Sequence, residues 1–154
     1  MARNRYNPTR TEVIIDNKKV LRKLNQIDLM VQGGSKQIRT ALRKGAKPWP
    51  NAVNGKIYNY VNRITGASEK PIGLQTWYAK VKNEYGVKAR AIVPRSSAAK
   101  KKQGGWRVHF FATPAKHIRR LKRIPFDSLY RQQTGNVIRS VGAKLQAVIR
   151  QNFG

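Results

Sequence analysis

Residues 35–61 read SKQIRTALRKGAKPWPNAVNGKIYNYV, and their apolar side chains recur at steps of three or four residues. This spacing predicts a helix with one apolar stripe, about seven turns long. The stripe consists of Ile38, Leu42, Ala46, Trp49, Val53, Ile57 and Val61. Pro48 and Pro50 should interrupt the helix near Lys47, because proline lacks the backbone donor and clashes with the preceding turn. We therefore expect two helical pieces that bury one shared face.

The residues before this stretch predict a strand and then a short helix. Residues 11–15, TEVII, have the density of β-branched side chains that is typical of strands. Asp16 and Asn17 then provide a cap for a helix, and Gly33 marks the break that ends it. The apolar side chains of this helix are Val20, Leu21, Leu24 and Ile27.

The residues after the stripe predict a loop, a short helix and a hairpin. Residues 63–73, RITGASEKPIG, are rich in helix breakers and predict the loop, and residues 74–85 predict a helix that a glycine ends. Residues 87–93 (VKARAIV) and 106–112 (WRVHFFA) alternate in polarity, which predicts two strands that pair with each other. Their connection, residues 94–105, is long, basic and rich in glycine, so we expect a mobile loop.

The C-terminal part combines a cationic segment with a long helix. Pro125 fits the first turn of that helix, which should run almost to the end of the chain. Its apolar face carries Phe126, Leu129, Tyr130, Val137, Val141, Leu145, Val148 and Ile149. No internal repeat marks a second domain. We therefore predict one α+β domain over residues 1–154, in which a small antiparallel sheet packs against a long kinked helix and a C-terminal amphipathic helix.

The charge of the chain predicts an anionic partner. Lys and Arg number 33 against 6 Asp and Glu, which gives a net charge of +27 on 154 residues. Like charges raise the free energy of the compact state, and a polyanion or an acidic protein surface relieves this repulsion. An apolar content of 40% excludes a disordered basic tail, and the absence of cysteine excludes disulfides and thiolate zinc sites. We expect a soluble chain without a secretory signal, a membrane span or a cofactor.

Two cationic clusters lie where the apolar stripes do not reach, and they predict a surface that faces an anion. Its residues are Lys100, Lys101, Lys102, Arg119, Arg120, Lys122 and Arg123. The structural alternative is that these side chains are an ordinary solvated face, since clustering by chance is expected in so basic a protein.

The aromatic and histidine residues allow a functional and a structural interpretation. Trp49, Trp77 and Trp106 could stack on bases, but each lies on an apolar face or strand, which favours core packing. His109 and His117 lack carboxylates nearby, so we expect no metal site. The pattern indicates no catalytic residues.

Three segments resemble the neck and tail-completion protein family of long-tailed bacteriophages. They are VLRKLNQI leading into KQIRTALRKGAKPWPNAV, the strands around VKARAIV and WRVHFFAT, and IPFDSLYRQQTGNVIRSVGAKLQAVIRQ. The chain departs from the family in its cationic HIRRLKR, where members usually have an acidic or Gly-rich turn.

The resemblance implies a structural virion protein that is not an enzyme and that assembles in the host cytoplasm. Such a protein would form a ring with copies of itself at the head-to-tail junction, beside other connector and tail proteins. Packaged DNA would contact it through phosphates alone, which carry no sequence information. Neck, tail-terminator and tail-completion roles are all compatible with the resemblance.

Two other functions remain open. A ribosome- or chromosome-associated protein that binds RNA or DNA would share the high charge and long basic loops. Residues 55–73 are similar to the first motif of the GIY-YIG nucleases at Ile57, Tyr58, Asn62, Gly66, Ile72 and Gly73. However, Pro71 stands where that family has its second tyrosine, and Glu84 is the acid nearest the expected metal position. Membrane-surface binding is disfavoured, since no single helix is both strongly basic and strongly amphipathic.

Overall fold

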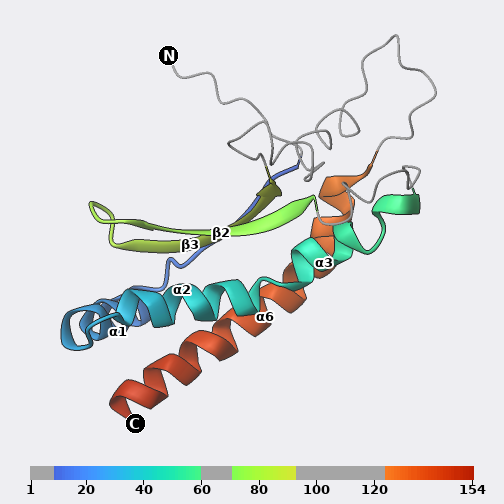
Figure 1. The fold of residues 1–154 in the computed structure, drawn as a ribbon. Coiled ribbons are helices and arrows are strands. Elements are labelled where there is room, and N and C mark those ends of the chain that lie inside the picture. The colour runs from blue at the N-terminus through green and yellow to red at the C-terminus, as the bar shows by residue number, and fades with distance from the viewer. Residues whose placement is uncertain (1–8, 60–70, 93–123) are drawn as a thin grey trace.

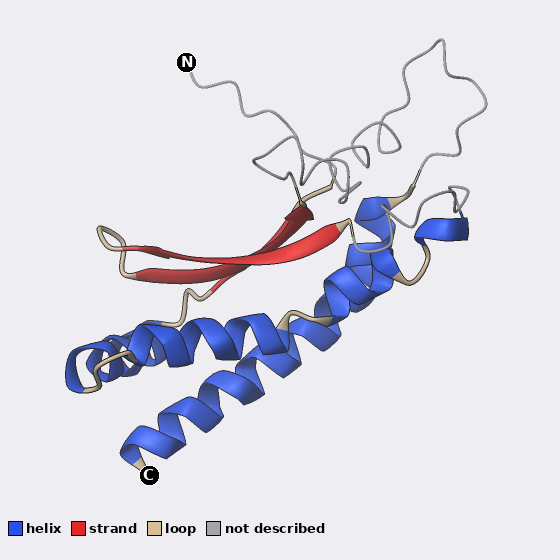
Figure 2. Cartoon of the chain, in the orientation of Figure 1, coloured by secondary structure: helices blue, strands red, loops and turns tan. Residues whose placement is uncertain are grey.

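A computed structural model describes residues 9–59, 71–92 and 124–154 as a layer of helices under a three-stranded antiparallel sheet (Figure 1). The α+β class predicted above is thereby confirmed. The elements in chain order are β1 (Thr11–Ile14), α1 (Lys18–Met30), α2 (Gly34–Gly45), α3 (Pro48–Asn54), the 3-10 turn η1 (Ile57–Asn59), β2 (Ile72–Ala79), β3 (Glu84–Ala91) and α6 (Phe126–Phe153). Figure 2 shows the strands on one side of these helices.

The first helix begins and ends where the sequence indicates. The side chain of Asn17 caps α1 by accepting hydrogen bonds from the backbone N–H groups of Lys19 and Val20, at 3.1 and 3.3 Å. Gly33, at φ 88°, then turns the chain into α2 with a left-handed conformation that glycine adopts at little cost. Gly34 lies so close to α1 that a Cβ there would be 2.6 Å from the carbonyl oxygen of Ile27.

The apolar stripe is interrupted as predicted, since α2 ends at Gly45 and α3 begins at Pro48. Its described members are at most 1% exposed and continue through the break: Ile38, Leu42, Ala46, Trp49, Val53 and Ile57. Val61 lies outside the described residues. The two helical pieces thus share one buried face.

The last helix is a single element, 28 residues long, that packs along both α2 and α3. Its buried side chains are Phe126, Leu129, Tyr130, Val137, Val141 and Leu145, as the sequence predicts. The hydroxyl of Tyr130 donates a hydrogen bond to the carbonyl oxygen of Thr9 at 2.8 Å, which ties the start of the chain to this helix. No helix in the described ranges is long and apolar enough to cross a membrane.

The predicted helix over residues 74–85 is wrong, because these residues form β2, a turn at residues 80–83 and the start of β3. In β2 the residues Ile72, Leu74, Thr76 and Tyr78 oppose Ala91, Ala89, Val87 and Tyr85 of β3. A strand places these alternate side chains on one face against the helices, whereas a helix would spread them around its axis. Asn83 closes the turn at φ 50°, a left-handed value that asparagine tolerates.

The strand predicted at residues 87–93 is observed as β3, and the partners described for it are β1 and β2. The sheet order is β1-β3-β2, so β3 is the central strand, and Val87 pairs with Val13 on one side and Thr76 on the other. A strand has only two hydrogen-bonding edges, and both are occupied here. Residues 106–112 and the predicted loop at 94–105 lie outside the described residues.

Candidate anion-binding surface

The predicted anion-facing residues all fall outside the part of the chain that the structure describes. They are Lys100, Lys101, Lys102, Arg119, Arg120, Lys122 and Arg123, and His109 and His117 fall outside it as well. The described residues provide a different cationic surface, on the face of the sheet that points away from the helices.

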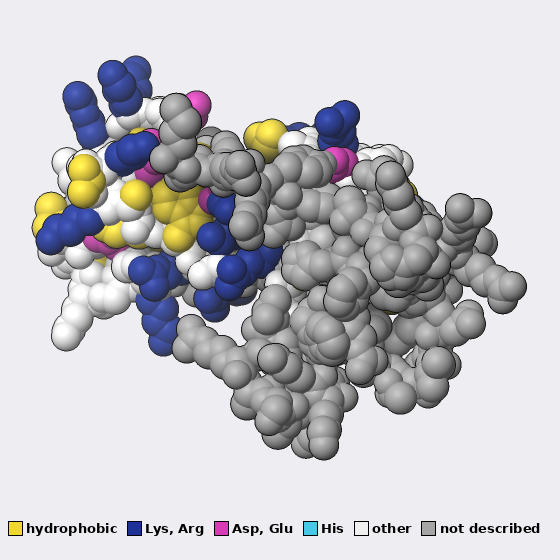
Figure 3. Space-filling view, turned by 90° about the horizontal axis from the view of Figure 1, so that it is seen from above, with side chains coloured by type: hydrophobic (Ala, Val, Ile, Leu, Met, Phe, Trp, Pro, Cys, Tyr) yellow, Lys and Arg dark blue, Asp and Glu magenta, His cyan; other side chains and the backbone are white. Residues whose placement is uncertain are grey.

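This outer sheet face is defined by alternation along the strands. Tyr85, Val87, Ala89 and Ala91 of β3 are buried toward the helices, so Gly86, Lys88 and Arg90 point the other way. Gly86 lies between Trp77 of β2 and Ile14 of β1, and Lys88 lies between Gln75 and Glu12. Figure 3, viewed from above, shows apolar side chains on the described part of this face with Lys and Arg side chains around them.

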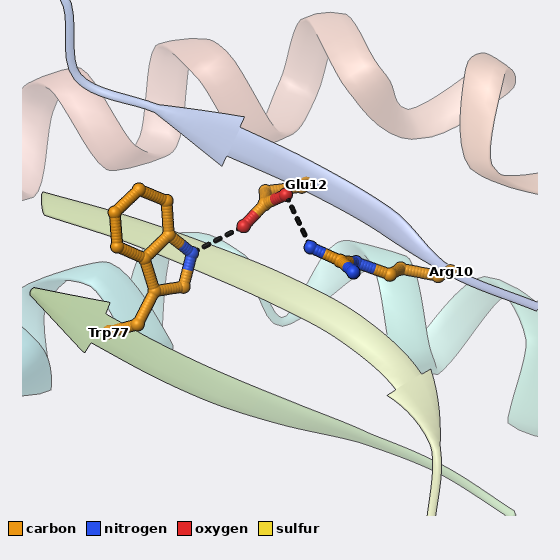
Figure 4. A network of polar contacts seen from close by, with 3 residues as sticks. All are labelled: Arg10, Glu12 and Trp77. Atoms are coloured by element: carbon orange, nitrogen blue, oxygen red, sulfur yellow. Dashed lines mark hydrogen bonds and ion pairs between the residues drawn. The ribbon is translucent and has the colours of Figure 1, made fainter. Parts of the chain in front are cut away.

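Trp77 lies flat across the central strand. A Cβ at Gly86 would be 2.4 Å from Cε2 and 2.5 Å from Cζ2 of the indole, so the ring rests directly on the glycine backbone. The indole Nε1–H donates a hydrogen bond to Oε1 of Glu12 on β1 (Figure 4). Glycine is therefore required at position 86, because any larger side chain would push the indole away from the sheet.

Glu12 connects the indole to a cation. Its second oxygen, Oε2, accepts a hydrogen bond from the guanidinium of Arg10 at 2.8 Å, and the two side chains form an ion pair (Figure 4). Each carboxylate oxygen thus has one partner, and the two bonds hold the tryptophan edge and Arg10 in a defined geometry. The Arg10 side chain remains 44% exposed.

The cations of the outer sheet face repel one another. Burial lowers the pKa of Lys88, and the nearby positive charges of Arg10 and Arg90 lower it further. The carboxylate of Glu12 acts in the opposite direction and raises this pKa. Arg10, Lys88 and Arg90 thus share this face with two carboxylates, and Glu12 is the one that acts on Lys88, while Glu84 lies at the start of β3. A bound anion would relieve this repulsion.

Two further cationic grooves flank the C-terminal half of α6. One, of about 390 Å³, lies between α2 and α6 and includes Lys36, Lys44 and Lys144. The other, of about 340 Å³, lies between α1 and α6 and includes Lys19, Lys23 and Arg150 around Val20 and Ile149. Both grooves are lined by apolar and basic side chains.

The two tyrosines with strongly shifted pKa values have structural roles. Burial raises the pKa of Tyr85, and the hydrogen bond that its hydroxyl donates to Asp28 on α1 raises it further. Burial is also the main reason that the pKa of Tyr130 is raised, with Asp127 adding to it. Both hydroxyls therefore stay protonated and link separate elements. Within the described ranges, no group of three His, Cys, Asp or Glu side chains could hold a metal ion.

The three tryptophans do not share one role. Trp49 is fully buried and contacts the ring of Tyr130 edge-on at 6.4 Å, which confirms its place in the core. The core position predicted for Trp77 is wrong, since it lies partly exposed on the outer sheet face. Trp106 lies outside the described residues. The available signal was Gly86, which lies inside a strand on the same face as Lys88 and Arg90, because a glycine within a strand indicates close approach of another group.

Comparisons of the chain with protein-family models, curated proteins and solved structures found no match. The arrangement itself offers positive charge, a flat aromatic ring and exposed hydrogen-bond donors, which suit the binding of a polyanion.

Proposed function

We propose that this chain is a structural component of a tailed bacteriophage, a neck or tail-completion protein that forms a ring at the head-to-tail junction. Its cations would face packaged DNA or acidic neighbours. The observation that carries the proposal is the charge distribution, since Lys and Arg occupy the outer sheet face and line both grooves beside α6. A ring around a DNA channel would give this charge a partner without any reading of bases.

The resemblance to neck proteins gains support from the packing of its segments. The N-terminal segment that carries it contains α1, α2 and α3, and the C-terminal one contains α6. In the structure α6 lies against all three of these helices. The two segments that resemble neck proteins thus form one helical layer, as expected if they belong to the same structural unit.

A candidate surface for subunit contact lies at one end of the molecule. We call Leu29, Met30 and Val81 the apolar end; they are 86%, 70% and 99% exposed. The end of α1 and the turn after β2 lie on the same side in Figure 1. The hydrogen bond from Tyr85 to Asp28 and the stacking of Tyr85 on Tyr78, with centroids 4.6 Å apart, hold the two segments together. Exposed apolar clusters of this kind often mark protein contacts.

The test is the mass of the purified protein by light scattering and particle imaging, after nuclease treatment and at about 0.5 M salt. High salt is needed because bound nucleic acid would bridge monomers and imitate assembly. We expect rings, either alone or with tail and connector proteins. The variant L29S/M30S should lose them, while I138S, which changes an exposed isoleucine on α6, should keep them. A strict monomer in the presence of those proteins would contradict the proposal.

A nucleic-acid-binding protein outside a virion is the second candidate. The observation in its favour is the partly exposed indole of Trp77 beside Lys88 and Arg90. The same mass measurement separates the two, because this candidate predicts a monomer that retains RNA or DNA at low salt and releases it at high salt.

A further inference from the structure

The outer sheet face is an unpartnered surface within the described part of the molecule. The helices α1 and α2 and the C-terminal half of α6 lie on the opposite side of the strands (Figures 1 and 2). Sheets that carry helices on one face commonly expose the other to solvent, and then its residues are polar. Here the face instead carries Trp77 and Ile14 on either side of Gly86, with cations around them. An exposed apolar patch that polar residues surround often marks an interaction site.

The indole of Trp77 is built as a rigid platform. One of its faces rests on the backbone of Gly86, and its edge is held by the hydrogen bond to Glu12. The side chain is partly exposed, so part of the ring is accessible from the outside. A ring that is already ordered loses little entropy when a flat ligand stacks on it.

The cations lie in a row that begins at this platform. Gly86, Lys88 and Arg90 are alternate residues of β3, so successive positions on this face are about 7 Å apart. Arg10, held by Glu12, adds a charge beside the row. A chain of phosphates that runs along β3 from the indole would meet Lys88 first and Arg90 next.

We propose that the outer sheet face binds single-stranded nucleic acid, with one base stacked on the indole of Trp77 and the adjoining phosphates on Lys88, Arg90 and Arg10. This inference rests on the sheet face alone and holds whether or not the chain forms rings. The carboxylate of Glu12 does not prevent phosphate binding, because its two oxygens already engage Trp77 and Arg10. Glu84 is a second carboxylate on this face, since it alternates with the buried Tyr85 of β3. Three cations against two carboxylates still leave the face positive.

The chemistry of the face favours single strands over other polyanions. Bases in a duplex are stacked on one another and do not offer a ring to the indole, whereas an unpaired base does. An acidic peptide could neutralise the cations but has no flat ring for Trp77. Base stacking on an aromatic side chain tolerates any sequence, which suits a site without side chains placed to read base edges.

The experiment compares two probes that differ only in their bases. A fluorescein-labelled oligothymidylate of about 15 nucleotides and its abasic counterpart are titrated with the full chain, and anisotropy is recorded. Wild-type protein should bind the oligothymidylate more tightly than the abasic strand. W77L, which keeps an apolar cover over Gly86, should lose about 5- to 150-fold in affinity for the oligothymidylate and little for the abasic strand. W77F should retain part of the difference between the probes.

The charge variants provide a matched comparison that does not depend on the tryptophan. K88Q/R90Q removes two charges from the outer sheet face, and K18Q/R22Q removes two exposed charges from α1. The first pair should lower the slope of log affinity against log salt by about 1.4, since each phosphate contact on a single strand contributes about 0.7. The second pair should change it far less.

Three results would overturn the proposal. The first is equal affinity of wild-type protein for the two probes. The second is an equal decrease in the salt slope for K88Q/R90Q and K18Q/R22Q. The third is tighter binding to poly-glutamate than to the oligothymidylate, with the same dependence on Trp77. The last would assign the face to an acidic protein. Circular dichroism of each variant shows whether it is folded, and the surface pair K88Q/R90Q keeps the test decisive even if W77L unfolds.

Discussion

The contact between α2 and α6 allows a sharp test of the packing. A Cβ at Gly45 would lie 2.6 Å from Cα, 2.7 Å from Cγ2 and 2.8 Å from the backbone nitrogen of Val141, so two of these three atoms belong to the helix backbone. A flexible side chain could move aside, but a helix backbone can only move as a unit. G45A should therefore push the two helices apart and loosen the core between them.

The expected magnitude follows from two opposing effects. Replacing glycine by alanine inside a helix stabilises it by about 1 kcal/mol, because glycine has more backbone freedom to lose. Overpacking a close contact costs about 1 to 3 kcal/mol, and here no side chain can relieve it. We expect the steric effect to win, with a net loss of about 2 kcal/mol in the free energy of unfolding for G45A.

Gly142 provides the control on the other helix of the pair. Nothing lies within 4 Å of a Cβ at this position, so G142A should gain about 0.5 to 1 kcal/mol from helix propensity alone. The assay is urea denaturation followed by far-ultraviolet circular dichroism for both variants. The same chemical change should thus have opposite effects at two sites. If G45A is as stable as wild type, the close approach of α2 and α6 is wrong.

The remaining predictions concern the ends and links of the helical layer. N17A should lose about 1 kcal/mol of stability in the same urea assay, because it removes the cap of α1, and K18A beside it should change stability much less. Wild-type protein should lose stability as the pH rises above about 10, since unfolded tyrosines then ionise while Tyr85 and Tyr130, whose pKa values are raised in the folded state, hold their protons. Y85F and Y130F should each flatten that decline, and an unchanged slope in both variants would contradict the raised pKa values.

The helices could be predicted because their apolar side chains repeat within each segment. The stripe from Ile38 to Ile57 and the buried face of α6 both follow a period that depends only on helix geometry, whatever the helix packs against. The interruption at Pro48 and the cap at Asn17 are equally local, since each depends on the chemistry of one residue. The buried side of β3 was predicted for the same reason, from alternation alone.

The second strand could not be predicted, because its local pattern is ambiguous. LQTWYAKVKNEYG contains apolar and aromatic residues that fit a short helix as well as a strand. Its structure is decided by the edge of β3, which supplies backbone partners from Ile72 to Ala79, and by the helices, which bury one of its faces. Strand propensity reflects such neighbours more than the residues themselves.

The sequence by itself determined the helical layer, the strongly basic character and the α+β class, because periodicity and charge are properties of the chain alone. Only the tertiary structure decided that β3 lies at the centre of the sheet and that Trp77 crosses Gly86 to reach Glu12. The hairpin of β2 and β3 brings Trp77 to Gly86, and the pairing of β1 with β3 adds Glu12, which lies 65 residues from Trp77 in the sequence. Such pairing depends on which edges and faces remain available once the helices have packed, and no local pattern records that.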